Sequence, residues 1–323
     1  MIKARFVSAV FLFLAVRAAG AQTPSDKLLL RLHVKPGQAL NLTVTTSGTT
    51  SLAVGATPTV IKMQLTEVLN CLVTKVADDG SATMATTVTA LRSVTNINGK
   101  ETVYDSGDTE HSSGPMAMGL GNLVGATIAT TTNPLGKVIK IEGLDDMVDR
   151  MLSRMPASSK VTPQAIENVK KSLKKIFSDQ AATQGSLTMG GFPVQPLAVG
   201  DSWVRGNAAF PGLTGAVKTT MTLKARHDGR AVIAMRVDMA PASNPRGIAV
   251  GDYNTKSSIG MHGSGTEIYD EATGLMIGGD FNLDSLSSML MRDTKRGTTV
   301  SSTQSTSKMS VHIESSGVAQ PGG

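Results

Sequence analysis

Alternating apolar and polar positions run along most of the chain and predict β-strands. Every second residue is apolar at 28–34 and at 40–44, the same period of two recurs at Ile61, Met63 and Leu65 within 60–76, and 81–94 is expected to return as a further strand. Because successive side chains of a strand point to opposite faces, this pattern predicts strands with one buried face. Two glycine-containing segments between them, Lys35-Pro36-Gly37-Gln38 and Asp78-Asp79-Gly80, predict the tight turns of β-hairpins.

A similar succession of strands and turns follows residue 190. Strands are predicted at 217–224 and 231–239 around a turn at Asp228-Gly229, and at 266–269 and 275–283 around a turn at 270–274. In the closing strand, apolar Met309, Val311 and Ile313 alternate with polar Ser310, His312 and Glu314. One face of this region should therefore be buried and the other polar.

The segment from Gly143 to Gln180 differs, because its apolar residues recur at helical spacing. A first helix is expected to begin near Leu144 and to end before Pro156, and Thr162-Pro163 is a suitable start for a second. The pair predicts an αα-hairpin from Leu144 to Phe177. Its apolar stripes suit packing against the sheets, while a lid over an apolar cavity and a basic surface for anionic lipid are the functional alternatives.

Together these elements predict a mainly β (α+β) fold made of two related curved antiparallel sheets or half-barrels, with the αα-hairpin inserted between them. The expected boundaries are a signal peptide at 1–21, a first β half at 22–142, the helical insert at 143–183, a second β half at 184–314 and a disordered tail at 315–323.

An internal repeat is indicated by three turns that occur in the same order in both halves. The glycines of these turns pair as Gly37 with Gly200, Gly80 with Gly229, and Gly136 with Gly274. Each turn alone is common, but three in order predict a duplication.

The N-terminus has the features of a secretory signal. Lys3 and Arg5 precede an apolar run at 6–16, and Ala19-Gly20-Ala21 supplies a small-x-small cleavage site. We therefore expect cleavage after Ala21 and a periplasmic or secreted protein. The cleavage site has no cysteine, so a lipoprotein anchor is not expected. No later stretch is apolar enough to span a membrane as a helix, so no transmembrane anchor is expected either.

Composition narrows the possible partners. Removal of the signal lowers the formal charge from +6 to about +3 and leaves eight of the eleven aromatic residues, so nucleic acid is not an expected partner. Cys71 is the only cysteine, which excludes an internal disulfide and a thiolate zinc cluster, and its apolar neighbours predict burial. The chain has 17 methionines, residues that fill cores and also line adaptable apolar binding surfaces.

No catalytic, cofactor or metal site is predicted. The histidines are not at metal-ligand spacing (His33, His111, His227, His262 and His312). Ser264 lies in Gly263-Ser264-Gly265, which is not a nucleophile elbow, and the adjacent pairs Asp78-Asp79 and Asp145-Asp146 have turn or capping roles. The glycines at 119–125 approach a dinucleotide fingerprint, but Val124 stands where its third glycine belongs. Trp203 is expected in the core of the second sheet.

Several motifs resemble those of a family of exported bacterial proteins known only as a domain of unknown function. They are Asp78-Asp79-Gly80-Ser81-Ala82, Tyr104-Asp105-Ser106, Asn133-Pro134-Leu135-Gly136-Lys137-Val138, and Phe192-Pro193 leading to Gly200-Asp201-Ser202-Trp203. The family supplies no activity or catalytic residues. In outline the predicted architecture is also similar to the half-barrels of periplasmic lipoprotein carriers.

We therefore expect a non-enzymatic protein that binds a lipid-like or hydrophobic ligand in the cell envelope, with ligand-binding residues that the sequence does not identify. A protein-interaction or structural envelope protein with a fully packed core is the alternative, and it predicts an exposed apolar patch instead of a cavity. A hydrolase would require Ser, His and Asp, or two carboxylates, to converge from distant segments.

Overall fold

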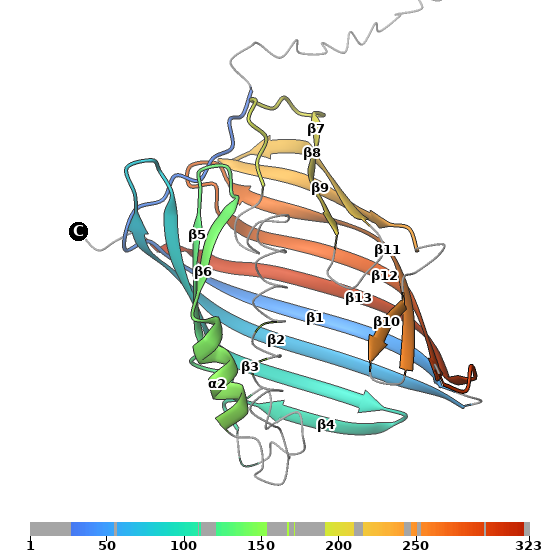
Figure 1. Cartoon of the computed structure of the whole chain (residues 1–323). Helices are drawn as coiled ribbons and strands as arrows, with labels where there is room; N and C mark the ends of the chain where they lie inside the picture. Colours follow the sequence, from blue (N-terminus) through green and yellow to red (C-terminus); the bar gives the residue numbers. More distant parts are fainter. Residues whose placement is uncertain are drawn as a thin grey trace, which may run out of the picture.

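Thirteen strands form one continuous antiparallel sheet in the described part of the computed structural model (Figure 1). The structure describes residues 27–54, 57–108, 110, 121–153, 167, 171, 191–209, 216–241, 247–250, 253–293 and 295–319. The strand order is β6-β5-β3-β2-β1-β13-β12-β11-β9-β8-β7, with β4 paired to β3 and β10 paired to β11.

The strands of the first half are β1 (Ala39–Val54), β2 (Thr57–Val76), β3 (Ala82–Ile97), β4 (Lys100–Asp105), β5 (Thr127–Thr132) and β6 (Val138–Glu142). The strands of the second half are β7 (Ser202–Ala209), β8 (Ala216–His227), β9 (Arg230–Met239), β10 (Gly247–Val250), β11 (Tyr253–Asp270), β12 (Met276–Asp293) and β13 (Thr299–Ala319). A mainly β antiparallel fold is thus confirmed.

The expected division into two sheets is wrong, because β1 and β13 join the halves in the middle of the sheet. Their register runs from Ala39 opposite Ala319 to Val54 opposite Thr303. Left apart, the two halves would each expose a long edge of unpaired N–H and C=O groups, and pairing these edges satisfies both. Local alternation carries no information about such a distant partner.

The three turn pairs recognised in the sequence hold equivalent places in this sheet. The order β6-β5-β3-β2-β1 is repeated as β12-β11-β9-β8-β7, on the other side of β13. Even the hydrogen bonds match, since the Gly37 N–H donates to Val73 O at 2.8 Å and the Gly200 N–H to Leu223 O at 2.7 Å. Both glycines have a positive φ, 85° and 100°, that L-residues rarely adopt.

Residues 27–34, here called the strap, cross one end of the sheet without joining it as a strand. Their predicted hairpin with 40–44 is wrong, because the strap binds turns from both halves. The Leu32 N–H donates to Pro134 O at 2.9 Å and the His33 N–H to Thr273 O at 2.9 Å. The strap still alternates in sequence because one of its sides packs on the core.

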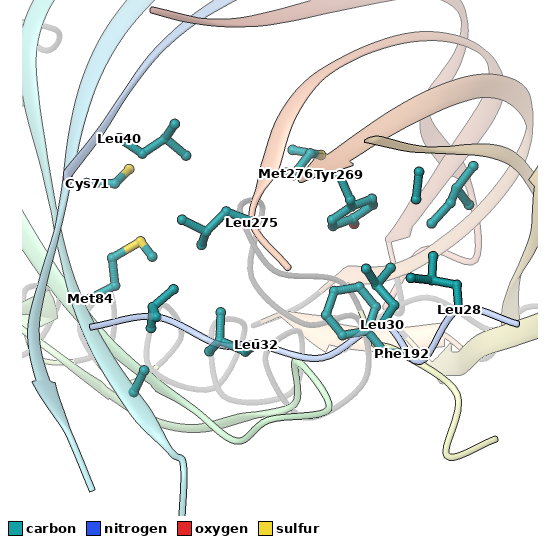
Figure 2. Packing of buried hydrophobic residues seen from close by; sticks show 14 of the residues in the cluster. Leu28, Leu30, Leu32, Leu40, Cys71, Met84, Phe192, Tyr269, Leu275 and Met276 are labelled. Atoms are coloured by element: carbon teal, nitrogen blue, oxygen red, sulfur yellow. The ribbon is translucent and has the colours of Figure 1, made fainter. Parts of the chain in front are cut away.

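The main hydrophobic core lies where the strap meets the sheet, at the end that carries the β2–β3, β5–β6, β8–β9 and β11–β12 turns. Figure 2 shows strap residues facing side chains from both halves of the curved sheet. We call the face of the sheet toward this core the inner face. Its central buried members include Leu30, Leu40, Cys71, Met84, Met221, Leu223, Ile233, Tyr269 and Leu275.

One helix, α2 (Leu144–Ser153), is present in the described residues, and it begins after Gly143, whose φ is 88°. Asp145 and Asp146 lie in its first turn, as predicted, where carboxylates complement the helix dipole. The αα-hairpin is not seen, since its second helix lies outside the described residues except for Glu167 and Lys171, which are both helical. Among the helical residues that are described, none forms a helix long and apolar enough to cross a membrane.

Candidate functional site

The two faces of the sheet differ in polarity, as the alternation in the closing strand predicted. Along β13, Met309 and Val311 are half-buried and Ile313 is buried, while the intervening Ser310 and Glu314 are exposed. The residues of β1 and β12 that pair with Met309, Val311 and Ile313 lie on the same face of the sheet as these three, the face toward the core. The inner face is therefore apolar here and the opposite, outer face is polar.

Short polar side chains pair across strands on the outer face. The Asn70 Nδ2–H donates to Asn41 Oδ1 at 2.7 Å, and the hydroxyls of Thr87 and Thr127 lie 2.7 Å apart. Two histidines also have carboxylate partners there, with His262 Nδ1 2.7 Å from Asp238 Oδ1 and His312 Nδ1 2.6 Å from Asp280 Oδ1. The hydrogen bond to Asp280 raises the pKa of His312 above its ordinary value.

A hollow of about 620 Å³ lies on the outer face over β4, β3, β2, β1, β13 and β12. Its lining is of mixed polarity and charge: it includes the charged residues Lys62, Lys308, Glu101 and Asp284, hydroxyl and amide side chains, and the apolar residues Met63, Val94 and Met309. The lining contains no aromatic ring and no histidine, so it offers neither a stacking platform nor a proton-transfer group of neutral pKa.

Apolar side chains continue along the inner face beyond the buried core. One row across the strands runs Leu65, Thr46, Val311, Phe281, Gly265 and Met235, and the next runs Met63, Gly48, Met309, Leu283, Gly263 and Val237. All large side chains in these rows are half-buried. We call these twelve residues the inner apolar rows, and they are the candidate ligand site.

Glycines shape the inner apolar rows by letting large neighbours lie flat on the sheet. A Cβ at Gly265 would come within 2.6 Å of Phe281 Cδ1, and a Cβ at Gly263 within 2.8 Å of Leu283 Cδ1. Phe281 and Leu283 therefore lie across the bare backbone of β11, an arrangement in which an aromatic ring covers a cross-strand glycine. Because neither glycine has a side chain, the inner face is flatter at β11 than it would be with larger residues there.

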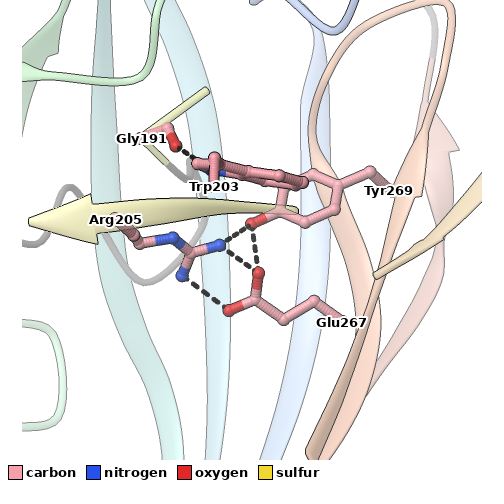
Figure 3. Close-up of polar contacts among 5 residues, drawn as sticks. All are labelled: Gly191, Trp203, Arg205, Glu267 and Tyr269. Carbon is pink, nitrogen blue, oxygen red and sulfur yellow. Dashed lines mark hydrogen bonds and ion pairs between the residues drawn. The ribbon is translucent and has the colours of Figure 1, made fainter. Parts of the chain in front are cut away.

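A buried polar cluster borders the site between β7 and β11 (Figure 3). Arg205 Nη1 donates to Glu267 Oε1 at 2.7 Å, and its Nη2 donates to Glu267 Oε2 and, at 3.1 Å, to the Tyr269 hydroxyl. That hydroxyl donates to Glu267 Oε2 at 2.8 Å. The side chains of Arg205 and Glu267 are only 11% and 5% exposed, so this is a bidentate ion pair inside the core region.

Burial governs the protonation of this cluster. Burial raises the pKa of Tyr269 far above its ordinary value, so the phenol keeps its proton and acts as a donor. Burial alone would lower the pKa of Arg205, but the neighbouring Glu267 and Tyr269 oxygens outweigh that effect and the net shift is upward. The two charges are paired, and the ion pair joins β7 to β11, while Arg205 Nε is buried without a hydrogen-bond partner among the described residues.

Two sequence predictions on single residues can be compared directly. Cys71 is 1% exposed, as predicted, and burial raises the pKa of its thiol, which accepts a 3.6 Å hydrogen bond from Thr86. Trp203 is half-buried rather than fully buried: it packs against the core and its Nε1–H donates to Gly191 O at 3.0 Å.

The other candidates are dispersed. His33 is on the strap, His227 is the last residue of β8, and His262 and Ser264 are on the outer side of β11. His111 and Gly119 lie outside the described residues. Asp79 binds Ser81 within its turn, as expected. Within the described ranges, no three potential ligands from His, Cys, Asp and Glu are grouped as a metal site would require.

Sequence reasoning missed the Arg205–Glu267–Tyr269 cluster. The available signal was positional: Arg205 shares the face of Trp203, and Glu267 shares the face of Tyr269, by the period of two. Charged residues on a face otherwise reserved for the core usually require a partner there, although the sequence alone does not say which one.

The model of a family of unknown function (DUF6263) matches residues 79–276. The chain is 8% identical to a lipovitellin structure concerned with lipid–protein interactions, with a TM-score of 0.47 over 90% of this chain but only 26% of lipovitellin. It thus spans about a quarter of that chain.

Two further structures are more distant. OccK5 of Pseudomonas aeruginosa is 7% identical over 86% of this chain and 98% of its own, with a TM-score of 0.24. A Vibrio parahaemolyticus domain described as part of an outer membrane lipoprotein-sorting protein is 9% identical over 86% and 84%, with a TM-score of 0.12. The search of curated proteins gives no match. These structural similarities are too low to carry an argument about function.

Proposed function

Taking as the premise that the chain belongs to the family of unknown function DUF6263, which assigns no activity, we propose that it binds a lipid-like or other hydrophobic ligand on the inner apolar rows. We further propose that it is exported to the cell envelope and acts without catalysis. The observation that carries the proposal is the half-buried state of the large apolar side chains in these rows, next to a core that is already closed by the strap.

Half-buried apolar side chains favour a hydrophobic partner for an energetic reason. Burial of apolar surface contributes about 25 cal/mol per Å², and only the surplus over the cost of association appears as affinity. The core cluster ends at Val44, Leu69, Phe281 and Val311, which are only partly buried against it. The inner apolar rows, to which Phe281 and Val311 belong, therefore retain apolar surface whose burial by a ligand is favourable.

The side chains in these rows suit a ligand of variable shape. Met63, Met235 and Met309 contribute flexible, polarisable thioethers to the two rows. Methionine adapts to differently shaped apolar partners at lower cost than branched side chains do. This composition favours a chain-like or mixed lipid over a single rigid ligand.

The non-catalytic part of the proposal is supported by where the reactive groups lie. The inner-face charges Arg205 and Glu267 are bound to each other, His262 and His312 have carboxylate partners on the outer face, and the remaining inner-face carboxylate, Glu67, has no histidine beside it among its direct cross-strand neighbours. A catalytic site needs a base and a nucleophile or second acid within hydrogen-bond reach of one reacting group, and the paired groups Arg205, Glu267, His262 and His312 do not supply such a combination at the inner apolar rows.

The test is lipid extraction and mass spectrometry on protein exported from the full-length gene and purified without detergent. We expect near-stoichiometric lipid with the wild type. Met309→Glu places a charge in the inner apolar rows and should remove the lipid, whereas Thr306→Glu, on the exposed side of the same strand, should retain it. Met309→Leu, which preserves apolar volume, checks that loss reflects charge and not misfolding.

Wild-type protein that is free of lipid and also fails to take up a hydrophobic dye would overturn the proposal. The interaction role would then be the better account. In that case the candidate surface for a protein partner would be the outer hollow together with Leu286, which is 53% exposed on the same face of β12.

A further inference from the structure

Glu67 is a carboxylate on the inner face with no partner in the described structure. It lies on β2 between Val44 of β1 and Leu91 of β3, which are its direct cross-strand neighbours. Val44 packs against the core and Leu91 is 1% exposed, so the surroundings of Glu67 are apolar. No hydrogen bond or ion pair joins Glu67 to another described residue, and it is itself half-buried.

A second polar group without a partner lies beside it. Ser93 pairs with Leu65, one row further along, so it is a diagonal neighbour of Glu67 at roughly 7 Å. Ser93 is 2% exposed, and its Oγ makes no hydrogen bond in the described structure. The Glu67 carboxylate and the Ser93 hydroxyl are thus neighbours on the inner face, and both lie beside the inner apolar rows.

Burying two polar groups without hydrogen-bond partners costs free energy unless a ligand supplies the missing partners. A buried polar group that makes no hydrogen bond loses its hydration without compensation, and a buried charge loses more. Glu267, in the same cross-strand row on the second half, has Arg205 and Tyr269 as partners. Among the described residues, Glu67 has no equivalent arginine on its side of the sheet, so its carboxylate is available to a cation on a bound ligand.

We propose that Glu67 anchors the head group of the bound amphiphile and that this head group carries a protonated amine. The ammonium would form a charge-assisted hydrogen bond with the Glu67 carboxylate and have the Ser93 hydroxyl within reach as a further acceptor. The hydrocarbon part would then lie along the inner apolar rows, which begin one row away at Leu65. This inference rests on the proposed function and specifies the ligand class for the same site.

The protonation of Glu67 makes the recognition dependent on pH. Burial raises the pKa of Glu67 above its ordinary value, and a bound ammonium would lower it again. Amine affinity is therefore full where the free carboxyl is ionised and is lost as the pH falls through the raised pKa. The side chains that face Glu67 from the flanking strands, Val44 and Thr46 on β1 and Leu91 and Ser93 on β3, do not titrate in this range.

The experiment compares chain-matched probes on delipidated full-length mature protein. Dodecylamine, dodecanol and dodecanoic acid compete with a hydrophobic dye for the wild type, for Glu67→Gln and for Glu101→Gln. Glu101 is an exposed carboxylate of the outer hollow, so its variant is the matched control. We expect the wild type and Glu101→Gln to prefer the amine over the alcohol by about tenfold or more.

In Glu67→Gln this preference should fall to about onefold while dodecanol binds as before, and the wild-type preference should disappear at acidic pH. Glu67→Gln is nearly isosteric and removes a desolvated charge, so its thermal midpoint should equal or exceed that of the wild type. If all three probes bind but the amine has no advantage, or keeps it in Glu67→Gln, the inference is overturned and the proposed function stands. If no probe displaces the dye, or no dye binds, the proposed function itself fails.

Discussion

At the residue scale, the ion pair between Arg205 and Glu267 is the interaction whose loss should be most costly. The two side chains are almost fully buried and joined by two hydrogen bonds, and Tyr269 completes the cluster. A buried ion pair contributes little compared with apolar residues of the same volume. Removal of one partner, however, leaves an uncompensated charge in the core region.

We therefore expect Arg205→Met to destabilise the protein by about 3–5 kcal/mol in urea unfolding, because Glu267 remains buried without its partner. The double change Arg205→Met with Glu267→Leu should recover much of this loss. Arg236→Met is the control, since its partner Asp238 is on the exposed outer face, and its midpoint should stay near that of the wild type. Equal losses for Arg205→Met and the double variant would contradict this account.

At the scale of elements, the strap shows how an alternating sequence can be mistaken for a strand. Leu28, Leu30 and Leu32 alternate because one side of the strap faces the core, yet its backbone bonds to turns and forms only an isolated bridge with Leu197. The hairpin turns at Gly80, Gly229 and Gly274 were predicted correctly, because their positive φ angles are a local requirement that glycine meets.

The β11–β12 turn should tolerate substitution less than its counterpart between β8 and β9. Gly274 and Gly229 have similar φ angles, 70° and 68°, but a Cβ at Gly274 would lie 2.1 Å from Arg31 O of the strap, while a Cβ at Gly229 meets nothing within 4 Å. Gly229→Ala should cost about 1 kcal/mol for the left-handed backbone alone. Gly274→Ala should cost more, and limited proteolysis should cut its strap faster.

Similar stabilities of the two alanine variants, with equal protection of the strap, would show that the strap does not rest on this turn. Because both substitutions impose the same backbone strain, the difference between them isolates the contact with Arg31.

At the scale of the whole molecule, local pattern predicted which residues face inward but not which strands meet. The polarity of β13 followed from its alternation, and so did the inward position of Met309 and Val311 in the candidate site. The join between β1 and β13, the strap and the Arg205–Glu267 pair depend on segments far apart in sequence. Periodicity is a property of one segment, whereas pairing is decided by the fit and the unsatisfied edges of two.

The proposed export makes a prediction about the chain as a whole. Expression of the full-length gene in a bacterial host should give an envelope or secreted fraction whose N-terminal residue is Gln22, measured by intact mass and N-terminal sequencing. A paired change of Ala19 and Ala21 to Leu should block processing, because the cleavage site requires small side chains. Recovery of the unprocessed wild type from the cytoplasm would contradict export.

The central β1–β13 pair also determines when and how the protein can fold. Contacts such as Thr50 Oγ1 with Ser307 Oγ join residues 257 positions apart, so the middle of the sheet cannot close until nearly the whole chain has been synthesised. Long-range pairing of this kind slows folding. Until then, β1 and β12 each present an open edge, and the N-terminal half of one molecule can accept the C-terminal half of another in the same register. Domain-swapped dimers are thus the misassembly to which this topology is most exposed.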